Sequence, residues 1–472
     1  MAVTYNDPKT VEINFAEIKQ QVSGYLAKVR IKTNGENLPQ PIMVQLKWKG
    51  EDILTWLQAQ RKLPKIYWQG RDDGLEIGGV GAALTLSEND PERVGEKYRF
   101  IRNILENVPG SSCLRFFGGA GFNNNVHPQK PWQDFPGFWY VLPEMMLCRQ
   151  RMDVFLVLTL VIDAEKSIDE LTEQLLRKIE GMNSGPDDLP ALPIPSLLKR
   201  HDYPNIHGWQ QNVLKSLSLI HSGSLQKVVL ARQTTLDFSV RLDWAGILSR
   251  LKEQNKNCFI FLFQPKEGKV FLGVTPERLF RIDHNLLISE AVSGTIPRGA
   301  DDLDDDRLGL DLLHSDKNLR EHRFVAESIK KMFDELCDNT GAQPNPRLLK
   351  LSNVQHLYSK ISGYLKKEIS LFDVIAKMHS TPAVGGTPRD AAVALIEELE
   401  PFDRGWYAGQ VGFISRDTGE MVVALRSMLL DESRIHLFAG AGIVSGSEPD
   451  LEWQELESKI SIPLQIFAGE KN

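Results

Sequence analysis

Short apolar runs separated by polar or glycine-containing segments recur along most of the chain. Runs of this kind, rich in Val, Ile, Leu and Phe, predict buried β-strands. The predicted strands cover residues 154–162 in the first part of the chain and residues 227–235, 258–264, 269–275, 410–415, 421–430 and 434–442 in the second. Most of them follow one another without an intervening helix.

A second pattern, with apolar positions three and four residues apart, predicts amphipathic helices. The predicted helices cover residues 168–181, 206–222, 306–338, 371–378, 387–398 and 449–459. Because strands occur in consecutive runs rather than alternating strictly with helices, we predict an α+β fold with large antiparallel sheets. A doubly wound parallel sheet would require strict alternation.

Four prolines lie within residues 185–195, and proline interrupts both helices and central strands. This stretch predicts an extended connector over residues 186–199. It separates an N-terminal part, residues 1–185, with glycine-rich strand segments, from a C-terminal part, residues 200–472.

Composition narrows the class of protein. The formal charge of −7 argues against a broad surface for nucleic acid or anionic membranes. Four cysteines without a CxxC pair disfavour a disulfide scaffold or a zinc finger. The run at 154–162 is too short to span a bilayer, and the first residues do not resemble a signal peptide. We therefore expect a cytoplasmic protein.

One glycine-rich segment, residues 438–446, precedes a predicted helix. Its GxGxxxG spacing matches neither the dinucleotide fingerprint nor the phosphate loop. Such a segment could present backbone N–H groups to an anion, or it could be only a tight turn.

Two predicted helices carry glutamates that could bind a metal. Glu452, Glu455 and Lys459 share one face of the last helix, where a solvated charged face is the simpler interpretation. Glu321 lies one turn before the apolar stripe of the 306–338 helix. Carboxylates from two helices could hold Mg²⁺, which binds few carboxylates and keeps several waters. His322 is adjacent, but the HExxH pattern of zinc hydrolases is absent.

Three further polar residues adjoin or interrupt apolar runs. Lys227 opens a predicted strand and is either a surface lysine or a general base. Glu277 follows another strand and could be the matching acid. Arg426 lies in the apolar run 421–430, which indicates that its guanidinium faces a carboxylate of the protein or of a ligand.

The chain is identified as a member of the chorismate-utilising enzymes by motifs that occur in the family's order. They are KVVLARQ, FLGVTPERLF, SEAVSGTIPRG, EHRFVAESI, VQHLYSKISG, STPAVGGTPRDAA, FDRGWYAGQVGF, VVALRSMLL and FAGAGIVSGSEPDLEWQELESKI. The segments RFFGGAGFN and WQDFPGFWYVLPE resemble the N-terminal half of the same fold. The resemblance therefore implies one structural unit with two layered antiparallel sheets and helices outside.

Within the family, TPAVGGTP resembles the isochorismate synthases, whereas anthranilate-type enzymes usually carry an HPxxxSGAP-like stretch. Lys227 matches a lysine typical of members that use water as nucleophile. The resemblance thus implies Mg²⁺-dependent conversion of chorismate to isochorismate. Salicylate synthases share the lysine and remain an alternative. Anthranilate or aminodeoxychorismate synthases and a non-catalytic chorismate-binding paralogue are disfavoured.

The resemblance also implies roles for individual residues. Lys227 would activate water for attack at ring carbon 2, and Glu277 would protonate the hydroxyl leaving ring carbon 4. Glu321 and Glu455 would hold Mg²⁺, with Glu452 as an outer partner. The remaining implied substrate-binding positions are Thr295, His356, Tyr407, Arg426, Gly440, Gly442 and Lys459.

The implied partner is the small molecule chorismate, with no nucleic acid, membrane or glutaminase subunit. The family precedent for this subgroup is mostly monomeric. Isochorismate can enter menaquinone or phylloquinone, siderophore or salicylate synthesis, and we favour quinone synthesis.

Overall fold

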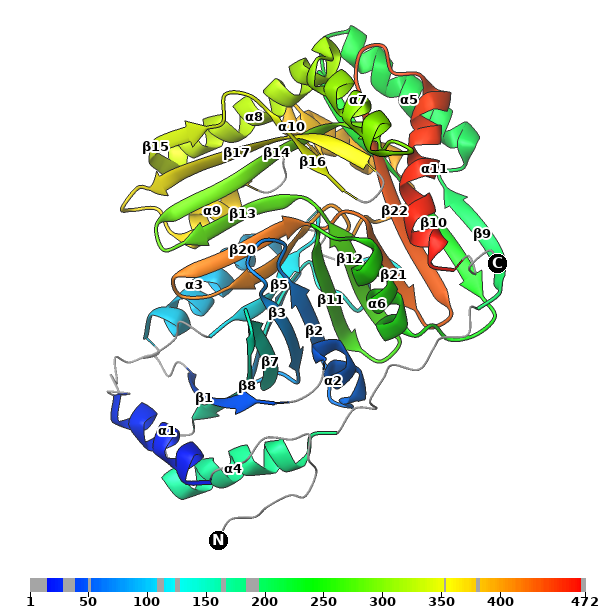
Figure 1. Cartoon of the computed structure of the whole chain (residues 1–472). Helices are drawn as coiled ribbons and strands as arrows, with labels where there is room; N and C mark the ends of the chain where they lie inside the picture. The colour runs from blue at the N-terminus through cyan, green and yellow to red at the C-terminus, as the bar shows by residue number, and fades with distance from the viewer. Residues whose placement is uncertain are drawn as a thin grey trace.

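A computed structural model describes residues 15–28, 39–49, 52–107, 114–123, 128–162, 167–183, 195–351, 354–378 and 383–467. Within these ranges the chain forms two antiparallel sheets with helices on their outer faces, which confirms the predicted α+β class. The two sheets meet near the middle of the molecule (Figure 1). No helix of the described part is long and apolar enough to cross a membrane.

The larger sheet has twelve described strands. In spatial order they are β1 (Gln40–Trp48), β8 (Asp153–Ile162), β7 (Met145–Gln150), β3 (Glu76–Val80), β2 (Lys65–Gln69), β11 (Phe259–Lys266), β12 (Lys269–Thr275), β21 (Ser427–Asp431), β22 (Arg434–Ile443), β10 (Lys227–Phe238) and β18 (Gly386–Thr387), with β9 (Leu197–Tyr203) also paired to β10.

The smaller sheet has ten described strands. Their order is β15 (Cys337–Ala342), β17 (Val354–Leu365), β14 (Leu286–Pro297), β13 (Arg278–Asp283), β20 (Thr418–Val423), β19 (Gln410–Ile414), β5 (Phe116–Ala120), β6 (Phe138–Leu142) and β4 (Leu84–Glu88), with β16 (Arg347–Lys350) also paired to β17.

The two parts of the chain share both sheets. Strand β2 of the N-terminal part pairs with β11 of the C-terminal part, and β5 pairs with β19. Of the predicted connector at residues 186–199, residues 186–194 lie outside the described residues, and residues 197–199 belong to β9. The strands β12 and β19 are buried at every position because neighbours cover both faces of the sheet. This is why their sequences are continuously apolar rather than alternating.

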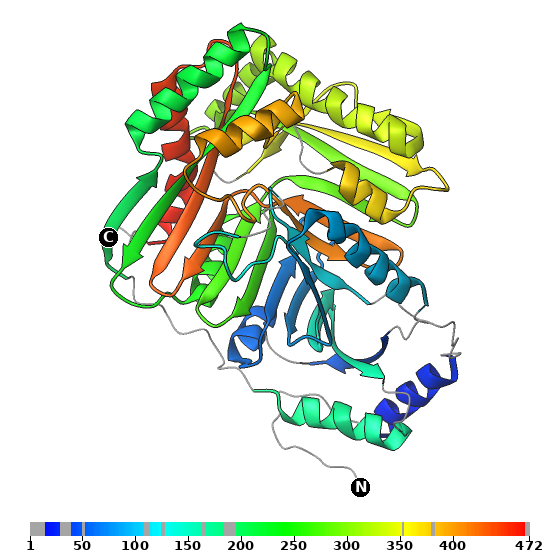
Figure 2. The same cartoon turned by 180° about the vertical axis from the view of Figure 1, so that it is seen from behind.

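Helices cover the outer faces of the sheets. They are α1 (Phe15–Lys28), α2 (Ile53–Ala59), α3 (Pro91–Asn107), α4 (Ile168–Glu180), α5 (Ile206–His221), α6 (Trp244–Gln254), α7 (Asp302–Leu313), α8 (Asp316–Leu336), α9 (Leu371–Met378), α10 (Arg389–Leu399) and α11 (Pro449–Gln465). In Figure 2, α10 crosses the face of β10, and α1 and α4 lie side by side at one end of the molecule.

Several predicted elements have different limits in the structure. The single helix predicted at 306–338 is wrong, because Ser315 caps a new helix by accepting a hydrogen bond from the Asn318 amide. The strand predicted at 421–430 is two strands, β20 and β21, which belong to different sheets. The helix predicted from residue 387 begins at Arg389, because Thr387 pairs with Lys227 in β18.

Cys148, Cys258 and Cys337 are buried, and Cys113 lies outside the described residues. The predicted glycine loop at 438–446 is also corrected. Strand β22 continues to Ile443, so Gly440 and Gly442 belong to a strand rather than to a turn.

Candidate active site

Two chain crossovers between the sheets meet at the centre of the molecule. Strand β12 ends in the larger sheet just before Glu277, and β20 ends in the smaller sheet just before the segment that carries Arg426. The Val274 amide donates to the Arg426 carbonyl at 3.2 Å, and the Val423 amide donates to the Glu277 carbonyl at 3.1 Å. These reciprocal hydrogen bonds fix the backbones of Glu277 and Arg426 side by side.

Arg426 is a positively charged residue that forms no ion pair with a carboxylate among the described residues. It has a φ of +46°, which takes it out of strand geometry at the crossover. Burial lowers the pKa of the Arg426 guanidinium. No ion pair joins it to a carboxylate in the part of the chain that the structure describes. A desolvated guanidinium of this kind is suited to an anionic ligand.

His356 orients that guanidinium. Burial, helped by the charge of Arg426, lowers the pKa of His356 to about 4, so the ring is neutral near pH 7. Its Nδ1 lies 3.2 Å from the Gly294 carbonyl oxygen and 3.0 Å from Thr295 Oγ1. A proton on Nδ1 would be donated to Gly294, which leaves Nε2 to accept from Arg426 Nη2 at 3.4 Å.

Glu277 has the electrostatic environment of a carboxylic acid. Burial raises its pKa to about 7, against the opposing positive charges of Lys227 and Lys459. The negative charge of Glu290 raises the pKa further. A substantial fraction of Glu277 is therefore protonated near neutral pH, as a general acid requires.

Lys227 begins β10 and its side chain is 14% exposed. Its Nζ lies 3.9 Å from Glu321 Oε1. The side chain passes over Gly442, where an added Cβ would lie 3.1 Å from Cε and 3.5 Å from Nζ. Glycine at this position therefore leaves the space that Lys227 occupies.

The two glycines of β22 turn their peptide groups away from β10. Val229, opposite Gly442, donates its N–H to Gly385 on the other side of β10, so this pair is not hydrogen-bonded. The Gly440 carbonyl accepts from Lys459 Nζ at 2.8 Å. Pairing with β21 ends before Gly440. The N–H groups of Gly440 and Gly442 consequently point toward a strand edge that a ligand can use.

Tyr407 lies over the same edge. Its ring stacks on Phe438 at 5.2 Å, and a Cβ at Gly440 would lie 2.9 Å from its hydroxyl oxygen. Burial keeps the pKa of Tyr407 above its ordinary value, so the hydroxyl remains a hydrogen-bond donor. Behind it, Arg404 pairs with Glu400 at 2.5 Å.

Half-exposed carboxylates come from two helices. Glu321 of α8 and Glu455 of α11 have side chains that are 46% and 49% exposed. Lys459 Nζ donates to Glu455 at 2.5 Å. Burial, and then the charge of Glu455, raise the pKa of Glu452, while the charge of Lys317 lowers it.

No group of three or more His, Cys, Asp or Glu side chains in the described ranges is arranged to hold a metal. Two carboxylates with water and a ligand oxygen are nevertheless a usual set for Mg²⁺. His322 is not a candidate, because it is buried and its ring nitrogens contact Ser293 and Ser359 at 3.2 and 2.8 Å. It, rather than Glu321, occupies the apolar face of α8.

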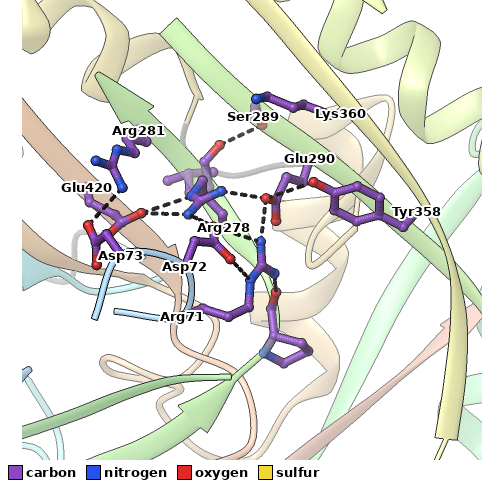
Figure 3. Close-up of polar contacts among 12 residues, drawn as sticks. Arg71, Asp72, Asp73, Arg278, Arg281, Ser289, Glu290, Tyr358, Lys360 and Glu420 are labelled. Atoms are coloured by element: carbon purple, nitrogen blue, oxygen red, sulfur yellow. Dashed lines mark hydrogen bonds and ion pairs between the residues drawn. The ribbon is translucent and has the colours of Figure 1, made fainter. Parts of the chain in front are cut away.

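Sequence reasoning missed the groups behind Glu277. Arg71, Arg278 and Glu290 form a buried cluster beside the crossover (Figure 3). The available signal was a glutamate inside the apolar strand 286–297, which required a buried cation.

Two large antiparallel sheets, with ionisable side chains gathered where the chain crosses from one sheet to the other, define the α+β fold and the candidate site. The model of the family described as "Chorismate binding enzyme" matches residues 26–467, so the chain belongs to this family. The resemblance seen in the motifs is thereby confirmed.

Individual relatives match over nearly the whole chain. The isochorismate synthase MenF of Haemophilus influenzae is 31% identical over 455 residues, which cover 96% of each chain. The salicylate biosynthesis isochorismate synthase of Pseudomonas aeruginosa is 37% identical over 444 residues, 90% of each chain. The solved structure of the menaquinone-specific isochorismate synthase MenF of Escherichia coli superposes with a TM-score of 0.81 and 29% identity, covering 96% of this chain and 100% of that one.

Proposed function

We propose that this protein is an isochorismate synthase that converts chorismate to isochorismate. The observation that carries the proposal is the nearness of Lys227, whose side chain passes over Gly442, to Glu277, whose pKa is raised to about 7. Lys227 begins β10 and Glu277 follows the end of β12, so both side chains project from strand ends. The relatives named above are isochorismate synthases.

In the proposed reaction, water attacks ring carbon 2 and Lys227 takes one proton from that water. The ring double bonds shift, and the hydroxyl on ring carbon 4 leaves with the proton of Glu277. One water enters and one leaves, so the reaction is an isomerisation. The general acid and general base need opposite protonation states at the same pH.

The remaining residues would hold the substrate. Arg426, oriented by His356 and Thr295, would bind the enolpyruvyl carboxylate together with Tyr407. The Gly440 and Gly442 N–H groups would donate to the same carboxylate.

The half-exposed Glu321 and Glu455 would hold Mg²⁺, with Glu452 and Lys459 on the same helix as Glu455. The ion would neutralise the ring carboxylate and favour charge displacement in the ring. We also propose a monomer that needs no glutaminase subunit and that supplies quinone synthesis.

A time course by NMR or chromatography with purified protein, chorismate and Mg²⁺, with and without ammonium, tests this function. We expect isochorismate without pyruvate and no effect of ammonium. Pyruvate with salicylate would indicate a salicylate synthase, and an ammonium-dependent product an anthranilate-type enzyme. Bound chorismate without conversion would indicate a non-catalytic paralogue.

A lysine variant tests the assignment of the base. Lys227→Ala should keep the fold and lose turnover by at least about 10²-fold, the usual contribution of a general base. Lys215→Ala is the matched control, since Lys215 is exposed and pairs with Glu398 on the surface. Equal activity of Lys227→Ala and the wild type would exclude Lys227 as the base.

A further inference from the structure

A buried carboxylate ties the two parts of the chain together behind the active site (Figure 3). The Glu290 side chain is fully buried in β14. Its Oε1 accepts from Arg71 Nη2 at 2.5 Å and from Arg278 Nη1 at 2.6 Å. The Tyr358 hydroxyl donates to the same oxygen at 3.1 Å. Arg71 comes from the turn between β2 and β3, whereas the others come from the C-terminal part.

This cluster holds the backbone on both sides of Glu277. Arg71 Nη1 donates to the carbonyl of Pro276, the preceding residue, at 2.8 Å. Arg278, the following residue, is bound to the same Glu290 oxygen as Arg71. The guanidinium carbons of the two arginines lie 5.0 and 5.1 Å from the centroid of the Phe259 ring. Each guanidinium is thus held by several hydrogen bonds and by its contact with the Phe259 ring.

One oxygen of the Glu290 carboxylate takes no part in these hydrogen bonds. Glu290 Oε2 is buried and has no hydrogen-bond partner among the described residues. The charged or titratable groups that act on or respond to Glu277 are Glu290, Lys227, Lys459 and Tyr407. Of these groups, Glu290 is the one whose negative charge raises the pKa of Glu277.

We propose that Arg71 is a positioning residue for Glu277, acting by locking Pro276 and Glu290 so that the acid is held at the crossover. The proposal rests on the proposed function, because it assigns no role to Arg71 other than through Glu277. It also gives the N-terminal part of the chain an indirect function in the reaction, since the turn between β2 and β3 carries the arginine.

The first test is Arg71→Lys, which keeps the positive charge but cannot donate in a fork to both the Pro276 carbonyl and Glu290. We expect kcat to fall at least tenfold, with KM for chorismate within about threefold of the wild type and little change in melting temperature. The control is Arg281→Lys, because Arg281 pairs with Asp73 at 2.9 Å on the edge of the same cluster and does not contact Pro276. It should keep kcat within twofold.

A second variant, Glu290→Gln, tests the same link through charge. Removal of the negative charge should move the basic limb of kcat/KM against pH to lower pH by about half a unit or more, because Glu277 would lose its proton more easily. A limb that stays in place would contradict the proposal. So would an Arg71→Lys variant with wild-type kcat, or one in which kcat, KM and melting temperature deteriorate together.

Chorismate turnover by the wild type and by Glu277→Gln, measured together with Arg71→Lys, distinguishes a failure of this proposal from a failure of the proposed function. A wild type that does not convert chorismate contradicts the function itself. An active wild type and an inactive Glu277→Gln, combined with an unaffected Arg71→Lys, contradict only the positioning role.

Discussion

Replacement of Arg426 by methionine should change activity and stability in opposite directions. Methionine is unbranched and of similar length, so it fills the crossover without a charge. In the ligand-free protein the guanidinium is partly buried with no carboxylate partner in the described residues, and its Nη2 lies 3.4 Å from His356 Nε2. With substrate bound, the same guanidinium would meet a carboxylate.

The expected loss of activity follows from the substrate-bound state, in which the guanidinium would pair with a carboxylate. Truncating one member of a desolvated charge pair costs about 2–5 kcal/mol. A value of about 3 kcal/mol corresponds to roughly 150-fold in kcat/KM, since each 1.4 kcal/mol is a factor of about ten.

The expected gain in stability follows from the ligand-free state, in which the guanidinium has no carboxylate partner among the described residues. Replacing buried ionic groups by apolar ones of similar volume stabilises proteins by about 1–4 kcal/mol. We expect the free energy of unfolding to rise by about 1–2 kcal/mol, the lower part of this range, because the contact with His356 already offsets part of the cost of burying the Arg426 charge. An unfolding entropy of about 2.1 cal/mol/K per residue gives about 1 kcal/mol/K for this chain. The melting temperature of the ligand-free variant should therefore rise by about 1–2 °C.

Steady-state kinetics and calorimetry of the ligand-free protein measure the two effects. Arg434→Met is the control, because Arg434 pairs with Asp237 on the surface, and neither quantity should change much. An Arg426→Met protein with normal kcat/KM and a lower melting temperature would refute the reasoning. It would show that Arg426 stabilises the fold rather than the bound substrate.

Three further predictions follow from the site. Because Glu277 must be protonated and its pKa is about 7, kcat/KM should fall as pH rises through about 7, about tenfold per unit, in a pH–rate profile. Gly442→Ala should lower kcat about tenfold by displacing Lys227, with unchanged circular dichroism. Gly95→Ala in α3, which has open space around it, should instead stabilise the protein by about 0.5–1 kcal/mol. Glu321→Gln should raise the Mg²⁺ concentration for half-maximal turnover at least tenfold, while chelation should stop turnover of the wild type without unfolding it. If the wild type and Glu321→Gln reach half-maximal turnover at the same Mg²⁺ concentration, Glu321 is not a metal ligand.

Much of the fold could be predicted because its signals are local. Apolar runs identify strands such as β11 and β12, and a continuous apolar run in an antiparallel sheet reports burial on both faces. The break between β20 and β21 was missed because residues 421–430 are apolar except at Arg426 and Ser427. The sequence indicates a carboxylate-facing Arg426 within one strand, and the apolar residues on both sides of it do not show that the chain changes sheet there.

Part of the site was predictable for a different reason. Lys227, Glu277, Glu321 and Glu455 lie in motifs that the family carries in order, so the resemblance names them. Arg71 lies in no such motif, and its partner Glu290 is 219 positions away in the sequence. Only the pairing of β2 with β11 brings them together, and that register is a tertiary property.

In our proposal, the placement of positive charge lets a chain with a net charge of −7 bind a multiply charged anion. Arg426 is partly buried, so its field is less screened by solvent than that of a surface arginine. The half-exposed carboxylates Glu321 and Glu455 would instead attract a diffusible cation. A fixed cation would therefore meet one carboxylate of the substrate, and an exchangeable cation would meet the other. Burial raises the pKa of Glu277 to about 7, which keeps a proton available for the leaving hydroxyl.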